Sequence, residues 1–134
     1  MIIIDASTLA KYILKEANWL DVETYLFLDL CSIDHIVKEV SNAIWKHTIL
    51  HKRFSIKEYS AAINALKRVV SDIITIESEV KYLDRAADIA LKYKLPIYDS
   101  LYIAQALKYG ELLTSDKEQA KVAKVLNIKV HYVE

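Results

Sequence analysis

The 134-residue sequence contains only one glycine, one proline and one cysteine. This scarcity excludes a glycine-rich phosphate-binding loop and a flexible glycine-rich linker between domains. The lone cysteine, Cys31, cannot form an internal disulfide, and its apolar neighbours predict a buried side chain in a reducing compartment. No internal repeat or low-complexity segment interrupts the chain. We therefore predict a single domain over residues 1–134.

The sequence also lacks an excess of either charge, because 18 lysine and arginine residues balance 18 aspartate and glutamate residues. Long-range attraction of nucleic acid needs a positive excess, so any contact with RNA has to rely on local basic patches or bound cations. The stretch before Asp5 contains too few apolar residues for a signal peptide or a membrane span. We expect a cytoplasmic protein that does not contact a membrane.

Basic side chains are densest between Lys46 and Arg53, a stretch that also contains His47 and His51. The four-residue spacing of the two histidines could place both on one zinc ion, but no third ligand is evident near them. A solvated helix face explains the stretch more simply, and contact with RNA phosphates is the alternative. Lys11 and Lys15, on the helix predicted after Asp5, are comparable candidates for a phosphate contact.

Short apolar stretches alternate with longer amphipathic ones along the whole chain. We predict strands at residues 2–4, 30–33, 74–76, 112–114 and 129–133. We predict helices near residues 9–13, 18–28, 36–51, 56–73, 79–93, 100–109 and 116–126. Strands that alternate with helices favour a parallel sheet covered by helices on both faces. The predicted fold class is therefore a three-layer α/β/α sandwich with a mostly parallel central sheet of four to five short strands.

Several residues mark the expected ends of these helices. Ser55 and Glu58 are spaced as in a capping box, which predicts the start of the long helix that follows. We expect Ser7 or Thr8 to cap the first helix and Gly110 to end the most apolar one.

Four acidic residues occupy positions that this fold would bring together. Asp5 directly follows the first predicted strand, and Asp116 follows the strand at residues 112–114. Because parallel strands end at one edge of a sheet, we expect both carboxylates at the edge where such folds bind ligands. Asp99 lies at the start of the most apolar helix, and Glu39 lies beside the apolar stripe of its own helix.

Each of these acids, taken alone, has a simpler explanation. Asp5, Asp99 and Asp116 can each be a helix N-cap, and Glu39 can be a surface residue. Together they form a concentration of negative charge that is costly unless cations neutralise it. Hard oxygen ligands with no histidine or cysteine nearby in the sequence favour Mg²⁺ or Mn²⁺ over Zn²⁺. The residues thus predict a site for a divalent metal ion.

Four segments of the sequence resemble the PIN-domain ribonucleases, and most of all the small VapC toxins of VapBC toxin–antitoxin pairs. They are Ile-Ile-Ile-Asp5-Ala-Ser-Thr, Glu39-Val-Ser-Asn42, Tyr98-Asp99-Ser-Leu-Tyr-Ile-Ala-Gln-Ala and Leu-Leu-Thr114-Ser-Asp116. The segments follow in the family's order and cover nearly the whole chain. One departure is Ser100, which stands where the family often has alanine. The resemblance implies an endoribonuclease that hydrolyses RNA through a metal-activated water, with Mg²⁺ or Mn²⁺ as cofactor.

The resemblance also implies a role for each acid. Asp5 and Asp99 would be the principal metal ligands, and Asp116 would bind metal directly or through water. Glu39 would complete the metal site and help to position the attacking water.

Two hydroxyl residues, Thr114 and Ser7, match hydroxyl positions of the family beside the last and the first acid. The resemblance implies that they hold a ligand carboxylate or a phosphate. Local helix capping is the alternative for both positions. Ser7 could cap the first helix, and next to Thr114 the pair Ser115 and Glu118 fits a capping box.

A toxin of this family implies two protein partners, a second copy in a homodimer and an antitoxin whose tail lies in an apolar groove near the site. Three other functions stay open. A housekeeping PIN nuclease that processes RNA would carry the same acids. A phosphatase with Asp5 as nucleophile would need a second aspartate where Ser7 stands. A catalytically silent binding module would be expected to have lost at least one of the four acids.

Overall fold

The computed structural model describes residues 1–134 and contains one sheet of five parallel strands. The strands are β1 (Ile2–Ile4), β2 (Leu30–Ile33), β3 (Ile74–Glu77), β4 (Glu111–Thr114) and β5 (Lys129–Tyr132). Their order across the sheet is β3-β2-β1-β4-β5, so the first strand of the chain is the central one. All five carboxyl ends lie at the same edge. The predicted parallel sheet is confirmed.

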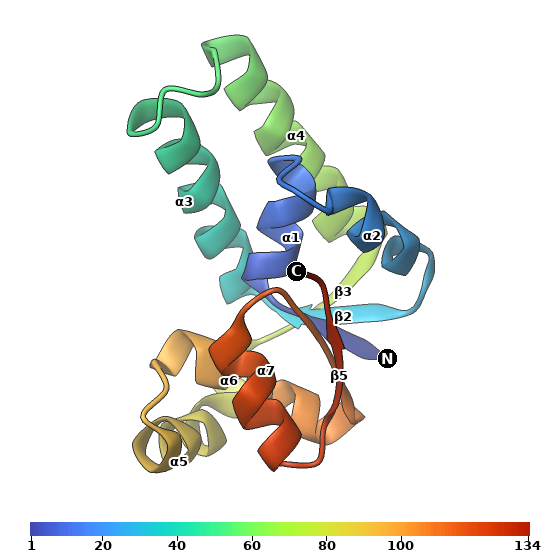
Figure 1. Cartoon of the computed structure of the whole chain (residues 1–134), viewed down its shortest axis with the longest axis vertical. Coiled ribbons are helices and arrows are strands. Elements are labelled where there is room, and N and C mark those ends of the chain that lie inside the picture. Colours follow the sequence, from blue (N-terminus) through green and yellow to red (C-terminus); the bar gives the residue numbers. More distant parts are fainter.

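Helices cover both faces of this sheet (Figure 1). One layer contains α1 (Ala6–Ile13), α2 (Trp19–Glu23), α3 (His35–Ile49) and α4 (Ile56–Asp72), and the other contains α5 (Leu83–Tyr93), α6 (Ile97–Tyr109) and α7 (Lys117–Val125). Short 3₁₀ turns at Thr24–Phe27 and Glu79–Tyr82 precede β2 and α5. The arrangement is the predicted three-layer α/β/α sandwich.

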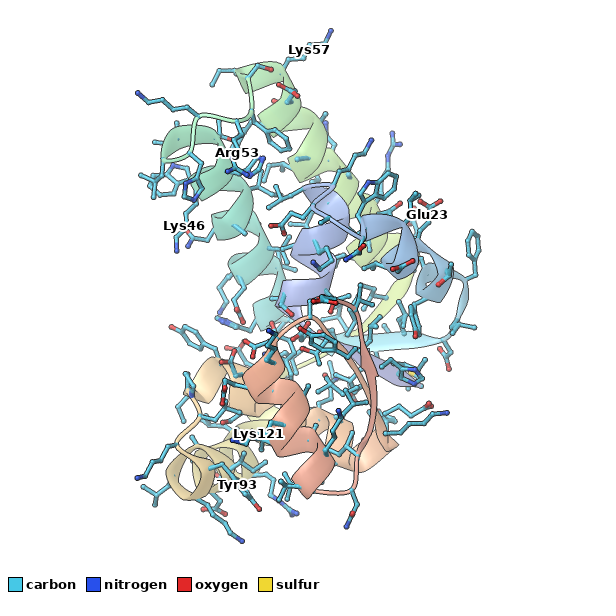
Figure 2. All side chains as sticks on the ribbon, viewed as in Figure 1. Glu23, Lys46, Arg53, Lys57, Tyr93 and Lys121 are labelled. Carbon is cyan, nitrogen blue, oxygen red and sulfur yellow. The ribbon has the colours of Figure 1, made fainter.

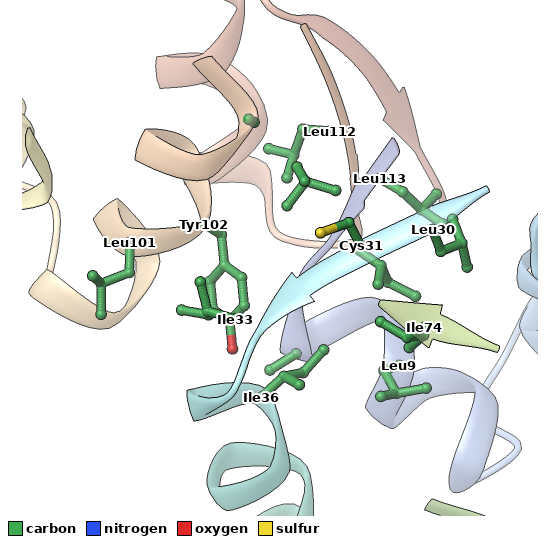
Figure 3. Packing of buried hydrophobic residues seen from close by; sticks show 14 of the residues in the cluster. Leu9, Leu30, Cys31, Ile33, Ile36, Ile74, Leu101, Tyr102, Leu112 and Leu113 are labelled. Carbon is green, nitrogen blue, oxygen red and sulfur yellow. The ribbon is translucent and has the colours of Figure 1, made fainter. Parts of the chain in front are cut away.

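The core lies on both faces of the three inner strands. Ile3, Cys31 and Leu112, one residue from each of β1, β2 and β4, have no exposed surface. Leu9 of α1 packs from one layer and Tyr102 of α6 from the other (Figure 3). Strands covered on both faces need apolar side chains at successive positions, which is why they are short apolar runs in the sequence. Cys31 is a free, buried thiol as predicted, and burial raises its pKa to about 11.

The helical hairpin of α3 and α4 reaches furthest from the sheet (Figure 1). Its second helix begins at the predicted capping box, in which Ser55 and Glu58 each accept a hydrogen bond from the other's backbone N–H, at 3.1 and 2.9 Å. The far end of the hairpin is poorly covered, and Ile56 is 72% exposed. No helix combines the length and apolar character that crossing a membrane requires.

The helix predicted at residues 18–28 is only half formed. α2 ends at Glu23 and the chain continues as a 3₁₀ turn. The Thr24 hydroxyl donates to the carbonyl oxygen of Asp21 at 2.8 Å, a local bond that competes with regular helical hydrogen bonding. Phe27 is 86% exposed, so no tertiary packing stabilises a longer helix here.

Candidate active site

The carboxyl ends of β1 and β4 place the first and the last of the four acids side by side. Asp5 directly follows β1 and is completely buried. Asp116 follows β4 by two residues. The hydroxyl of Thr114 connects them, because it donates to Asp5 Oδ2 at 2.6 Å and accepts the backbone N–H of Asp116 at 3.0 Å.

Asp5 accepts further hydrogen bonds from the first turn of α1. The hydroxyl of Ser7 donates to its two carboxylate oxygens at 2.8 and 2.9 Å, and the backbone N–H of Thr8 donates to Oδ1 at 3.0 Å. The bond from Thr8 makes Asp5 the N-cap of α1. The prediction that Ser7 or Thr8 caps this helix is therefore wrong, because both residues already lie inside its first turn.

Asp99 lies in the first turn of α6 without capping it. The helix starts directly after Pro96, earlier than predicted. Proline suits the start of a helix because a residue there donates no backbone N–H to a helical hydrogen bond. The Asp99 carboxylate instead accepts a bond from Gln119 Nε2 at 3.1 Å. Asp116 is the N-cap of α7 and accepts two backbone N–H groups at 2.8 and 3.1 Å.

Glu39 reaches the cluster from α3, where one tyrosine bonds to its carboxylate and one histidine lies beside it. The hydroxyl of Tyr102 donates to Glu39 Oε1 at 2.9 Å, and Figure 3 shows Tyr102 reaching from α6 toward the start of α3. His35 Nε2 lies 3.2 Å from the same oxygen, and its ring packs on Tyr98 at a centroid distance of 4.4 Å. The interpretation that no histidine stands near the acids in the sequence is therefore wrong, because His35 is four residues before Glu39.

The four acids, here called the acidic cluster, affect one another's charge. Burial, together with the negative charges of Asp116, Glu39 and Asp5, raises the pKa of Asp99 to about 6. Burial also raises the pKa of Asp5 to about 6, although hydrogen bonds led by that from Thr114 lower it in part. No lysine or arginine forms an ion pair with any member of the cluster.

The acidic cluster fits a divalent cation in its charge and in its oxygen donors. No three carboxyl, imidazole or thiol side chains already converge on one point where an ion would be held. Two causes account for this spacing. Like charges repel, and each carboxylate is drawn toward a protein donor, as Glu39 is toward Tyr102 and Asp99 toward Gln119. Binding an ion therefore requires some of these side chains to rotate away from their donors.

Sequence reasoning missed three residues that hold the acids. Tyr102 lies one turn after Asp99 on α6, and His35 lies one turn before Glu39 on α3, so both share a helix face with an acid. Gln119 lies one turn into α7, after the cap formed by Asp116. The helical spacing was a usable signal for His35 and Tyr102, whereas the contact of Gln119 with α6 depends on how two helices pack.

Comparisons with known proteins agree with this architecture. The family model described as PIN domain matches residues 2–125. Ribonuclease VapC3 of Pyrobaculum aerophilum is 30% identical over 125 residues, which cover 90% of this chain and 92% of VapC3.

Solved structures share the fold at lower identity. The crystal structure of PAE2754 from Pyrobaculum aerophilum has a TM-score of 0.71 at 24% identity, covering 96% of this chain and 89% of that one. VapC20 of Mycobacterium tuberculosis, a sarcin-ricin loop cleaving toxin, has a TM-score of 0.65 at 17% identity, with 90% and 94% covered. The family match extends over nearly the whole sequence, and the chain belongs to the PIN-domain family.

Proposed function

We propose that this protein is a Mg²⁺- or Mn²⁺-dependent endoribonuclease that acts as the toxin of a VapC-type toxin–antitoxin pair. The observation that carries the proposal is the acidic cluster, whose negative charges no lysine or arginine neutralises. Membership in the PIN family and the likeness to a protein named as a ribonuclease support the same activity. The name of VapC20 as a toxin supports the finer assignment.

Asp5 and Asp99 are proposed as the principal metal ligands, with Asp116 binding directly or through water. Bound divalent cations lower the pKa of water and polarise a phosphodiester. Glu39 is proposed to complete the metal site and to help position the attacking water. Its partly exposed side chain, 28% accessible, and its hydrogen bond from Tyr102 support this role.

The neighbouring residues keep the acids in position. Thr114 and Ser7 fix the orientation of the Asp5 carboxylate through short hydrogen bonds. Gln119 does the same for Asp99, and it also joins α7 to α6. Such supporting bonds limit the rotation of ligand carboxylates and so favour a single arrangement around a cation.

An aspartyl phosphatase fits the sequence less well. Such an enzyme needs a second aspartate two residues after the nucleophile, and Ser7 stands there. Attempted trapping of a phosphoaspartate at Asp5 tests this alternative, and we expect no trapped product.

Cleavage of RNA by the purified protein tests the proposed function. We expect cleavage with Mg²⁺ or Mn²⁺, none with excess EDTA, and a loss of at least about a thousandfold in Asp99→Asn. Asp88→Asn on the exposed face of α5 is the matched control and should cleave like the wild type. Full activity in Asp99→Asn, or undiminished cleavage in EDTA, contradicts the proposal.

The proposed partners are an RNA substrate, a VapB-like antitoxin and a second copy of the chain, all met in the cytoplasm. Co-purification with the product of the adjacent gene distinguishes a toxin from a housekeeping RNA-processing nuclease. A small partner that inhibits cleavage supports the toxin. Cleavage that is essential for growth and has no such inhibitor supports the housekeeping enzyme.

A further inference from the structure

A groove runs between α1 and α3, and its inner end is lined by a residue that is hydrogen-bonded to the acidic cluster. The two helices lie side by side and extend away from the sheet (Figure 1). The hollow between them has a volume of about 460 Å³. Its inner end is lined by Ser7 and Ser115, and Ser7 donates to Asp5 while accepting the backbone N–H of Ser115 at 3.0 Å. The inner end of the groove is therefore separated from the buried Asp5 carboxylate by one hydrogen-bonded side chain, that of Ser7.

The lining of this groove, here called the α1–α3 groove, is strongly basic. Its charged and titratable residues are Lys11, Lys46, His47, His51 and Arg53, with Glu16 as the single acid. Although the whole chain has a net charge of zero, five of these six side chains carry or can acquire a positive charge. The groove is therefore a local positive surface on a neutral protein.

These cationic groups are available to a ligand. Neither Lys46 nor Arg53 forms an ion pair, although Glu16 lines the same groove. Lys11 makes one hydrogen bond, to the carbonyl oxygen of Ala17 at 3.2 Å, which leaves two ammonium protons free. Burial and the nearby charge of Arg53 lower the pKa of His47, as expected where positive charges gather.

A second basic hollow offers an internal comparison. Lys67 and Arg68 line it on α4 together with Asn64 and Ser71, and its volume is about 510 Å³. It shares no residue with the acidic cluster or with the α1–α3 groove. Figure 2 shows Lys46 on α3 and Arg53 in the segment that connects α3 to α4. Of the two hollows, only the groove has a lining residue, Ser7, that bonds to a member of the acidic cluster.

We propose that the α1–α3 groove binds the phosphates of one RNA strand next to the bond that is cleaved, an inference that rests on the proposed function. Phosphates are the groups that unpaired lysine and arginine side chains recognise on nucleic acid. Ribonucleases commonly act on unpaired strands, whose phosphates can follow a basic groove without the second strand of a duplex. Lys46 and Arg53 supply the outer contacts, and Lys11 supplies one nearer the acids.

The test compares two double variants with the same change in charge. Lys46→Gln/Arg53→Gln removes two cations from the groove, and Lys67→Gln/Arg68→Gln removes one lysine and one arginine from the second hollow. Binding of a single-stranded RNA of mixed sequence is measured in EDTA at several salt concentrations, so that cleavage does not interfere. Thermal unfolding establishes that both variants are folded.

We expect the groove variant to raise the Kd for RNA roughly tenfold. The slope of log Kd against log salt should fall by about 1.4, because each phosphate contact to a single strand contributes about 0.7. The control variant should bind RNA within about twofold of the wild type, since its cations do not contact the strand.

Equal losses in both variants, or wild-type binding by the groove variant, overturn the proposal. Loss of antitoxin binding with unchanged RNA binding also overturns it, because the groove then belongs to a protein partner. If the wild type does not cleave RNA but binds it through the groove, the proposed function fails while the groove assignment stands.

Discussion

Two acids at the same edge of the sheet, Asp5 after β1 and Glu77 at the end of β3, have opposite electrostatic surroundings. Burial by itself would raise the pKa of both carboxyl groups, and hydrogen bonds oppose it. At Asp5, hydrogen bonds led by that from Thr114 offset burial only in part, and the pKa is about 6. At Glu77, hydrogen bonds led by that from Tyr82 outweigh burial and hold the pKa well below its usual range.

The difference lies in the donors around each acid. Glu77 accepts hydrogen bonds at 2.6, 2.9, 3.0 and 3.0 Å from Tyr82, Gln105, Tyr109 and Lys81. A second ammonium group, that of Lys108, lies 3.7 Å away. The charge of Glu77 is therefore neutralised inside the protein, where it joins β3 to α6.

This contrast shows that an acid at the end of a strand does not by itself mark a site. Glu77 has enough protein donors and cations to be a structural residue. Asp5 has only hydroxyl and backbone donors, and its neighbours Asp99, Asp116 and Glu39 add negative charge. A metal site is indicated by acids that no lysine or arginine neutralises, and not by the presence of an acid alone.

The largest expected effect is the pH dependence of stability in metal-free buffer. The pKa of Asp5 is about 6 in the folded protein, above the ordinary aspartate value of 3.8, so folding favours the protonated form. Its stabilising contribution is complete below about pH 4 and is lost as the pH rises through 6. Between pH 4.5 and 7.5 the loss is roughly 2 kcal/mol.

Urea unfolding of the wild type and Asp5→Asn at these two pH values measures that contribution. Asp5→Asn should remove about 2 kcal/mol of the difference in unfolding free energy. Glu77 cannot produce the same result, because its pKa is lowered by folding. Its contribution to the stability of the protein is lost as the pH falls, and this loss begins only below about pH 5. The same pH difference in both proteins contradicts the assigned pKa.

A second prediction concerns Glu77 itself. Glu77→Gln should lower the free energy of unfolding by about 1–2 kcal/mol, because charge-assisted bonds to Lys81 and Tyr82 are weakened. Urea unfolding at pH 7.5 measures the loss, with Asp88→Asn as the control for removing one negative charge. RNA cleavage per folded molecule should not change. A large loss of cleavage would mean that Glu77 belongs to the site.

The smallest expected effect comes from Thr114, whose hydroxyl is hydrogen-bonded to Asp5 and to the backbone of Asp116. Thr114→Val removes the donor to Asp5 and the acceptor for the backbone of Asp116, and should lower kcat/KM for RNA roughly tenfold. Thr48→Val is the matched control, because the Thr48 hydroxyl bonds only to Ile44 of its own helix at 2.9 Å. An equal effect of both substitutions contradicts a supporting role for Thr114.

The fold was largely predictable because its strands are buried on both faces. Such strands are continuous apolar runs, and all five fell at or near the predicted positions. The exceptions arise where tertiary context overrides a local pattern. The second half of the helix predicted at residues 18–28 has no surface to pack against, and Phe27 stays exposed.

The placement of the acids could be predicted only in part. Asp5 and Asp116 follow from strand ends in a parallel sheet, a rule that needs no side-chain detail. The contacts that orient Glu39 and Asp99 come from His35, Tyr102 and Gln119, and these depend on rotamers and on the packing of α3, α6 and α7. The basic residues near Lys46 were visible in the sequence. The groove that they line could not be predicted, because it is formed by the packing of α1 against α3.

Titration of the metal-free protein with Mn²⁺, followed by electron paramagnetic resonance, tests the central claim most directly. The acidic cluster should bind Mn²⁺ in the wild type and in Glu77→Gln. Asp5→Asn and Asp99→Asn should each lower the affinity at least about tenfold. Unchanged Mn²⁺ affinity in the two aspartate variants, or an equal loss in Glu77→Gln, would contradict the assignment of the metal site to the acidic cluster.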